Sequence, residues 1–564
     1  MNKKSKYSLF SKAFMAGSIL LLGTPANVHT VSAETAIPNS FDVKKIAGYS
    51  MGLSNEDGGV AEIVKYNADN KKFYVINGYG QTIDIVSLKN LKKSSKEQQQ
   101  LQKEKSIQIA EAVNSDTFTY GDVTSIEIDR KRDVIVAAVQ EADYTKNGKI
   151  VVMNYDGKIL KTYDAGVQPD MVKLTEDGKY ILSADEGEPR AGFDGEDPQG
   201  SVTIIEAKSG KTTRVLFNDQ NAIADDVHIR NHGTKADAVK DFEPEYIAVS
   251  ADGKKAFVTL QENNAIATID IKNGKILSVK SLGYKDHSLP GNELDAARNG
   301  KIELERLPIL GAYMPDSVAY VKIKGDEYLV TANEGDATEW PEEDPAFINV
   351  ADFKDIKNTI RLNPDRIKGM TAEEAQAAFD KMKNSDAYKK LEVLTDRGND
   401  AIYTLGGRSF SIWKADTMEL VYDSGSDFET ITAQRLPDVF NWSNDDDEFE
   451  KRSAKKGPEP EDVKIGIVGG EVFAFVGLER IGGVMTYNIT NPENAQFANY
   501  FNSRDFSQAI AGDVSPEGIE FIDAKDSPTK RPLILVGNEV SGTVSVNELY
   551  VQPGKEKSTP AKFN

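Results

Sequence analysis

One β-hairpin pattern recurs along this chain, with carboxylates at both of its open ends. The clearest copies span residues 171–186 and 246–262, where an Asp-Gly-Lys turn joins two β-rich runs. An Asp-Gly turn between such runs is the strongest short-range signal for a hairpin. A single hairpin cannot bury its own faces, so the repetition predicts an array of hairpins that pack on one another.

Two acidic dipeptides mark the ends of each hairpin. A Pro-acid pair precedes the first strand, and an Asn-Glu or similar pair follows the second. Because the two strands run antiparallel, both carboxylates should project from one face, with the Asp-Gly turn on the other. The Pro-acid pairs are Pro169-Asp170, Pro244-Glu245, Pro315-Asp316, Pro460-Glu461 and Pro516-Glu517, with Gly121-Asp122 in the matching place. The later pairs are Gln140-Glu141, Asp185-Glu186, Gln261-Glu262, Asn333-Glu334 and Asn538-Glu539, with Leu478-Glu479 as a near match.

A second hairpin follows the first in several repeats, as in residues 201–216 and 265–279. Four strands per repeat are typical of a β-propeller blade. We therefore predict an all-β fold, a single β-propeller of about seven four-stranded blades over residues 34–550, with six or eight blades as alternatives. Residues 41–51 are expected to supply the last strand of the final blade and close the ring. The predicted units start near Gly59, Gly121, Pro169, Pro244, Pro315, Pro460 and Pro516.

The fifth unit is interrupted by a predicted helical insertion at about residues 341–395. Within it, Thr371 can cap a helix and Glu374 can complete a capping box. The outer strands of the unit are expected to resume at residues 401–414 and 420–425.

The ends of the chain predict an extracellular protein. Residues 1–33 resemble a secretory signal peptide, with lysines, an apolar stretch and a Val-Ser-Ala cleavage site. The alternative, a membrane anchor, is disfavoured because the apolar stretch is too short to span a bilayer. Residues 551–564 form a short polar tail. We expect a secreted protein, extracellular or loosely associated with the cell surface, without a transmembrane segment.

Composition excludes some chemistries. The chain has no cysteine, so disulfides and thiol catalysis are excluded. Its formal net charge of −21 disfavours nucleic acid and favours divalent cations, a mineral or a cationic cell-surface partner. Solubility is the simpler explanation of the same acidity.

The acidic face is the predicted metal site. Clustered carboxylates repel one another unless protons or cations intervene, and Ca²⁺ accepts six to eight oxygen ligands in flexible geometry. The alternative is that each acid caps backbone amides at its blade edge. The candidate metal ligands are Asp170, Glu186, Glu245, Glu262, Asp316, Glu334, Asp336, Glu461, Glu479, Glu517 and Glu539.

Other motifs give weaker evidence for a functional site. His228 and His232 are four residues apart, but surface histidines explain them better than a metal site. The acidic run at residues 444–456 is interpreted as a solvated loop, with a calcium site as the alternative. No Gly-x-Ser-x-Gly elbow, P-loop or HExxH motif occurs.

Several longer stretches carry a family resemblance. They include DFEPEYIAVS at 241–250, LVTANEGD at 329–336, VGLERIGGV at 476–484, NSRDF at 502–506, SPEG at 515–518 and NEVSGT at 538–543. These resemble the choice-of-anchor I family, which includes mesenchyme-specific cell-surface glycoproteins and bacterial secreted proteins, some described as atypical alkaline phosphatases. The resemblance implies a secreted or surface propeller-like module, and its animal members are associated with calcium carbonate deposition. It supplies no agreed catalytic residues.

Two functions follow as hypotheses. The first is a non-enzymatic binding module whose acidic face holds calcium. The second is a calcium-dependent phosphoesterase, in which cations clamp the phosphate and activate water while an arginine assists. Arg190, Arg480 and Arg504 lie near the acidic motifs, and Arg480 is the leading candidate for phosphate binding.

Overall fold

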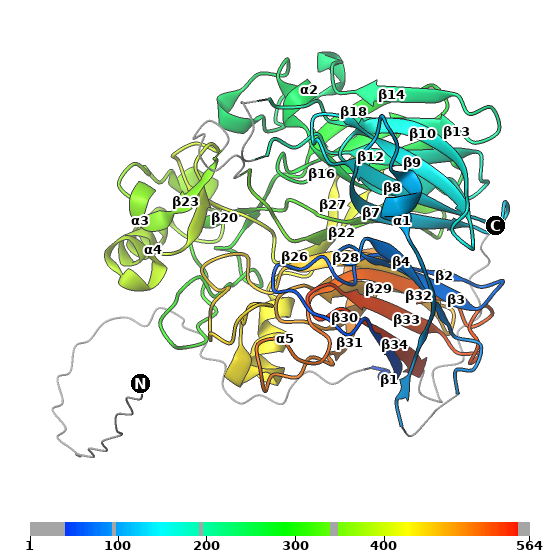
Figure 1. The fold of residues 1–564 in the computed structure, drawn as a ribbon. Coiled ribbons are helices and arrows are strands. Elements are labelled where there is room, and N and C mark those ends of the chain that lie inside the picture. The colour runs from blue at the N-terminus through cyan, green and yellow to red at the C-terminus, as the bar shows by residue number, and fades with distance from the viewer. Residues whose placement is uncertain (1–39, 93–96, 191–195, 339–347, 551–564) are drawn as a thin grey trace, which may run out of the picture.

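Antiparallel four-stranded meanders dominate the computed structural model, which describes residues 40–92, 97–190, 196–338 and 348–550 (Figure 1). Within these residues, six sheets have four strands in meander order, and a further sheet joins both ends of the chain. The first three sheets are β2 (Val64–Asn67), β3 (Lys72–Asn77), β4 (Thr82–Ser87), β6 (Lys103–Ile107); β7 (Tyr120–Asp129), β8 (Val134–Glu141), β9 (Asn147–Asn154), β10 (Ile159–Val167); and β11 (Pro169–Leu174), β12 (Tyr180–Asp185), β13 (Ser201–Glu206), β14 (Thr212–Leu216).

The next three sheets follow the same order. They are β15 (Pro244–Val249), β16 (Lys255–Leu260), β17 (Ala265–Asp270), β18 (Lys275–Ser281); β21 (Val318–Ile323), β22 (Asp326–Asn333), β26 (Ser409–Lys414), β27 (Leu420–Asp423); and β28 (Pro460–Val468), β29 (Glu471–Leu478), β30 (Val484–Asn488), β31 (Gln496–Phe501). The last sheet holds β32 (Pro516–Ile522), β33 (Leu533–Asn538), β34 (Thr543–Tyr550), β1 (Asp42–Ser50) and the two-residue β5 (Gln99–Gln100).

The first strands of these sheets surround a central channel. Each contacts the next in the order β2, β7, β11, β15, β21, β28, β32, and β32 contacts β2. The predicted all-β propeller is confirmed, and seven blades is our interpretation of this closed order. The hydrophobic core lies between neighbouring sheets, where aromatic pairs such as Phe410 and Tyr487, with centroids 4.6 Å apart, fill the space.

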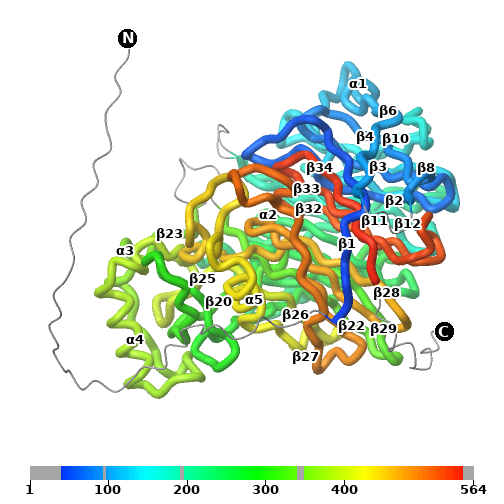
Figure 2. Tube along the Cα trace, turned by 90° about the horizontal axis from the view of Figure 1, so that it is seen from below, coloured from blue at the N-terminus to red at the C-terminus, as the bar shows by residue number. Residues whose placement is uncertain are grey.

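The ring is closed by the strand that precedes the first sheet. β1 pairs antiparallel with β34, from Asp42 opposite Tyr550 to Ser50 opposite Thr543. Figure 2 shows the blue N-terminal strand beside the red C-terminal strands. The side chain of Tyr49 also donates a hydrogen bond to Asp84 in the first sheet, at 2.7 Å. The predicted closing segment is therefore paired as expected.

The insertion in the fifth unit packs with the segment that connects the fourth and fifth sheets. That segment holds β19 (Tyr284–Asp286) and β20 (Ile309–Ala312), which form a three-stranded sheet with β25 (Ile402–Thr404). The insertion also contains the pair β23 (Val350–Asp352) and β24 (Glu392–Leu394). Residues 402–404 were expected in the fifth blade, but they pair parallel with β20 instead. The insertion has its own apolar cluster, which includes Phe353 and Phe379, and it projects from the propeller (Figure 1).

Helices are short and lie outside the blades. The predicted capping box of Thr371 and Glu374 is present at the start of α4 (Ala372–Asn384). The others are α1 (Ile109–Val113), α2 (Ala238–Asp241), α3 (Phe353–Ile356) and α5 (Asp427–Arg435), with 3₁₀ turns at Gln220–Ala222, Arg230–His232, Pro364–Arg366, Asp386–Tyr388, Pro437–Val439 and Pro492–Asn494. Among the described residues, no helix is both long enough and apolar enough to cross a membrane.

Replacing Ile46 with alanine tests whether the closing strand stabilises the ring. Ile46 is fully buried in β1, so the loss of its side chain should lower the free energy of unfolding by about 2–5 kcal/mol. Asp42→Ala, at an exposed position of the same strand, should change it by no more than about 0.5 kcal/mol. Denaturant unfolding measures both, and equal stabilities of the two variants would show that the closing strand is dispensable.

Candidate functional site

A β-bulge places an acid at the start of the first strand in five sheets. In each, the ladder between the first and second strands shifts register at the acidic residue or beside it. A bulge leaves its extra residue unpaired and turns its side chain to a new direction. Proline begins four of these strands, where the missing N–H costs no ladder bond. The acids at the bulges are Asp122, Asp170, Glu245, Glu461 and Glu517.

The backbone before the Pro-acid pairs is also unusual. Gln168, Met314, Glu459 and Ser515 each precede one of these prolines, and each has a positive φ between 48° and 66°. Left-handed backbone is uncommon for residues other than glycine and costs of order 1–3 kcal/mol. This left-handed conformation recurs at four equivalent positions, which indicates that the backbone just before these four first strands must adopt one defined conformation.

The acids meet at one end of the channel. A cavity of about 390 Å³ is lined by ten of the eleven predicted metal ligands. The exception is Glu262, whose neighbour Gln261 lines the cavity instead. We call this cavity the acidic mouth; its predicted ligands are Asp170, Glu186, Glu245, Asp316, Glu334, Asp336, Glu461, Glu479, Glu517 and Glu539.

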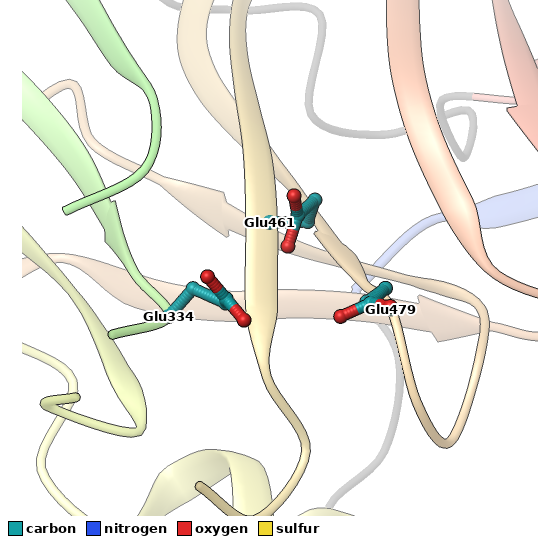
Figure 3. Close-up of side chains that lie close together, drawn as sticks. All are labelled: Glu334, Glu461 and Glu479. Carbon is teal, nitrogen blue, oxygen red and sulfur yellow. The ribbon is translucent and has the colours of Figure 1, made fainter. Parts of the chain in front are cut away.

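Three glutamates of the acidic mouth come closest together. Glu334 follows β22, Glu461 lies in β28 and Glu479 follows β29, and each offers a carboxylate oxygen within 4.8 Å of the other two (Figure 3). We call them the glutamate triad. Glu334 accepts hydrogen bonds from Gln261, at 2.8 Å, and from Lys456. By contrast, Oε2 of Glu461 is closed off from solvent and has no hydrogen-bond partner.

Basic residues line one side of the mouth and are held by a buried glutamate. Glu459 is fully buried and accepts from Arg452 at 2.6 Å and from Arg480 at 3.0 Å. Lys456 lies 3.3 Å from the same carboxylate. Arg480 also pairs with Glu479 at 3.1 Å, and its Nη1 donates to Asn444 at 2.7 Å. Arg480 and Lys456 therefore face the glutamate triad from fixed positions.

A layer of paired charges lies deeper among the first strands. Lys65 and Lys173 are 3.6 and 3.3 Å from Glu127, and Lys464 is 2.7 Å from Asp462. Although burial opposes ionisation, the two lysines lower the pKa of Glu127 to about 2. These lysines neutralise their own carboxylate partners, so they do not compensate the acids of the mouth.

Burial and mutual repulsion raise the pKa values of the mouth acids. Burial is the larger cause for Asp170, whose pKa rises to about 6, and for Glu479, whose pKa rises to about 8. The pKa of Glu461 lies well above its usual value through burial and then through Asp316 and Glu334. By contrast, hydrogen bonds hold the pKa of Asp252, at a turn of the opposite face, near 2. Holding several of these carboxylates ionised at once is therefore unfavourable.

Some acids of the repeat do serve as caps. Glu141 accepts from the backbone N–H of Thr119 at 3.1 Å, and Glu539 accepts from Gly59 at 3.0 Å and from Ser515 at 2.9 Å. In the first sheet, Gly78 takes the place of this glutamate. A side chain there would come within 2.7 Å of the carbonyl oxygen of Gly59.

Three expectations need correction. Arg504 is a structural residue, because both of its terminal nitrogens donate to backbone carbonyls. His228 is partly buried and hydrogen-bonds Asp396 at 2.9 Å, whereas His232 is exposed as expected. Residues 444–456 are not a fully solvated loop, because Glu450 is buried and accepts three backbone N–H groups from residues 299–301.

Other residues of the site were missed from the sequence. Glu62 lines the channel beneath the mouth but lacks the Pro-acid signature, since it follows Ala61. Lys456 and Glu459 come from a connecting segment outside the repeat. Asp122 was not missed, because it occupies the matching position of the repeat. Arg190, which was a candidate from the sequence, lies 3.5 Å from Glu188.

Comparison with known proteins identifies the family of this chain. The model of the choice-of-anchor I domain matches residues 62–492. The chain belongs to this family. Two similar proteins are Gigasin-3a of Magallana gigas, 33% identical over 178 residues, and a mesenchyme-specific cell surface glycoprotein of Strongylocentrotus purpuratus, 26% identical over 277 residues. The matches cover 28% and 44% of this chain, but only 63% and 35% of these relatives.

Solved structures with a similar chain path include Kuenenia stuttgartiensis hydrazine synthase, with a TM-score of 0.42 and 10% identity. That match covers 89% of this chain and 99% of the other. The WD40 domain of Toxoplasma gondii coronin has a TM-score of 0.43 at 8% identity, covering 92% and 90%.

The pKa values predict how stability depends on pH once metal is chelated. A carboxyl whose folded pKa is raised stabilises the native state while protonated, and this contribution is lost as pH rises through the folded pKa. For Glu479 that value is about 8. The melting temperature should therefore fall as pH rises from about 7 to about 8 and level off above that value, a range in which ordinary histidines are mostly neutral.

Glu479→Gln supplies the control, because its amide does not titrate. The variant should lose part of the pH dependence in melts recorded with a chelator. A parent protein whose stability rises over this pH range would contradict the assignment.

Proposed function

We propose that this protein is an extracellular interaction module whose acidic mouth binds calcium. The observation that carries the proposal is the glutamate triad, three carboxylates from three strands within 4.8 Å at the end of a channel. Membership of the choice-of-anchor I family and similarity to a cell surface glycoprotein support the extracellular setting.

The donor set suits a hard cation. Carboxylate and amide oxygens are the ligands that Ca²⁺ prefers, and its flexible coordination tolerates the unequal environments of the three glutamates. Among the described residues, no donor reaches Oε2 of Glu461, so a cation would supply its missing partner. Lys456 and Arg480 already engage Glu334 and Glu479, so they orient these carboxylates for the ion.

A calcium ion held here would also serve recognition. Three carboxylates fill only part of a coordination shell of six to eight oxygens. The remaining positions face the open mouth, where a mineral surface or a partner's oxygen atoms can bind. The other mouth carboxylates provide a negative surface for a cationic partner.

Glu461→Gln tests the calcium site. Removing one charged ligand should weaken Ca²⁺ binding at least about tenfold, because ligand charge sets calcium affinity. Isothermal titration calorimetry measures the affinity. The matched control is Asp252→Asn, at an exposed turn of the opposite face, which should bind calcium like the parent protein. Equal affinities of the two variants would contradict the assignment of the triad.

A calcium-dependent phosphoesterase is the second candidate. The observation that favours it is that Arg480 and Lys456 line the same cavity as the triad, so a phosphate there would meet both a cation and an arginine. Against it, Arg480 already has three protein partners: Glu459, Glu479 and Asn444.

Arg480→Ala separates the two functions. If the protein cleaves phosphate esters, losing this contact should lower kcat/KM about ten- to a hundredfold, corresponding to about 1.5–3 kcal/mol. Asp252→Ala should retain the parent rate, and both variants are checked for native melting. Absence of calcium-dependent hydrolysis in the parent protein would leave the binding module as the function.

A further inference from the structure

A second set of carboxylates lies beneath the glutamate triad. A cavity of about 150 Å³ between the first strands is lined by six acids. One of them, Asp462, is paired with Lys464 at 2.7 Å. Of the other five, four also line the acidic mouth, whereas Glu62 lines only the deeper cavity among the described pockets. We call these residues the inner ring: Glu62, Asp170, Glu245, Asp316 and Glu517.

The inner ring lacks the hydrogen bonds that other buried acids of this chain receive. Asp84 accepts from Tyr49, Thr82 and Ser106, and Asp185 accepts from three hydroxyls of its own sheet. Within the part of the chain that the structure describes, no hydrogen bond or ion pair reaches the carboxylates of Glu62, Asp170, Asp316 or Glu517. The chain therefore partners its buried acids elsewhere but leaves the inner ring open.

Glu245 adds a separate observation. Its Oε2 atom is closed off from solvent and has no hydrogen-bond partner, although the residue borders both cavities. Leaving a buried carboxylate oxygen without a donor is costly. A position that excludes water and lacks a donor is suited to a proton or to a bound cation.

Charge balance favours the cation. The nearest lysines below, Lys65 and Lys464, lie within 3.6 Å of Glu127 and 2.7 Å of Asp462, and so compensate those acids. Lys456 and Arg480 compensate Glu334, Glu459 and Glu479 on the side of the mouth. Arg190 partly compensates Asp170. One divalent ion at the triad would therefore leave the other four acids of the inner ring, Glu62, Glu245, Asp316 and Glu517, without a counter-charge.

We propose that the inner ring is a second binding site for a hard divalent cation, beneath the glutamate triad and separate from it. The proposal rests on the calcium site of the proposed function and adds a second ion to it. Among the described residues, only the triad brings three ligand oxygens within 4.8 Å. The inner ring is wider, so water molecules complete the coordination of its cation, as is common for calcium.

Calcium binding to matched variants tests the second site. Glu62→Gln changes the inner ring alone, and Glu479→Gln changes the triad alone. Titration with Ca²⁺ should give two ions per parent chain and a loss of at least about tenfold in affinity for one ion in each variant. Asp252→Asn is the surface control, and melting curves confirm that each variant is folded.

The outcomes distinguish the two sites. A single ion that Glu479→Gln weakens and Glu62→Gln leaves unchanged would overturn the inner site and keep the proposed function. No calcium binding by the parent protein would overturn both. If Glu62→Gln does not fold, an anomalous difference map from parent crystals grown with calcium decides the question: two peaks along the channel support the inner site, and one peak at the triad overturns it.

Discussion

Backbone pairing between β1 and β34 holds the ring of sheets together, and the position of every channel residue depends on that closure. Each blade packs mainly on its two neighbours, so an open ring would expose two apolar faces and separate the first strands. The closing strand contributes a ladder from Asp42 to Ser50 and a buried side chain, Ile46. Closure is what brings carboxylates that are hundreds of residues apart into one cavity.

The closed ring gathers buried carboxylates that repel one another at one end of the channel. Bulges after the prolines turn Asp170, Glu245, Glu461 and Glu517 to that end, where burial and mutual repulsion raise the pKa of each acid. The left-handed residues Gln168, Glu459 and Ser515, which precede three of these prolines, add backbone strain. Other acids of the same chain, such as Asp185, receive three hydroxyl donors. Within the described residues, the acids of the inner ring receive no such donors, although Glu539 of the mouth accepts from the hydroxyl of Ser515. We propose that a bound cation compensates the inner ring.

Much of this arrangement was readable in the sequence, because the repeat carries both the strands and the acids. The Asp-Gly turns predicted the hairpins. The Pro-acid pairs, together with the later acidic pairs and the stretch ending at Asp336, predicted the shared acidic face and ten of the residues that line the mouth. Local patterns could not predict contacts made by irregular segments. Glu62 lacks the proline signal, and Lys456 and Glu459 reach the site from a connection whose path depends on the whole fold. The strand at residues 402–404 does not join its expected blade, because it pairs parallel with β20, which precedes the fifth sheet. Glu262 has the same motif as Glu334, yet Gln261 occupies the position facing the mouth.

The central claim is that cations compensate the acids of the channel. The most direct measurement is the thermal unfolding of the intact protein in calcium and in excess chelator, combined with metal analysis of the purified protein. A ligand that binds only the native state raises its stability in proportion to the logarithm of its concentration. We predict bound calcium and a melting temperature that is higher in calcium by several degrees, with the difference growing as calcium is raised. Superimposable melting curves from a protein that contains no metal would contradict the account.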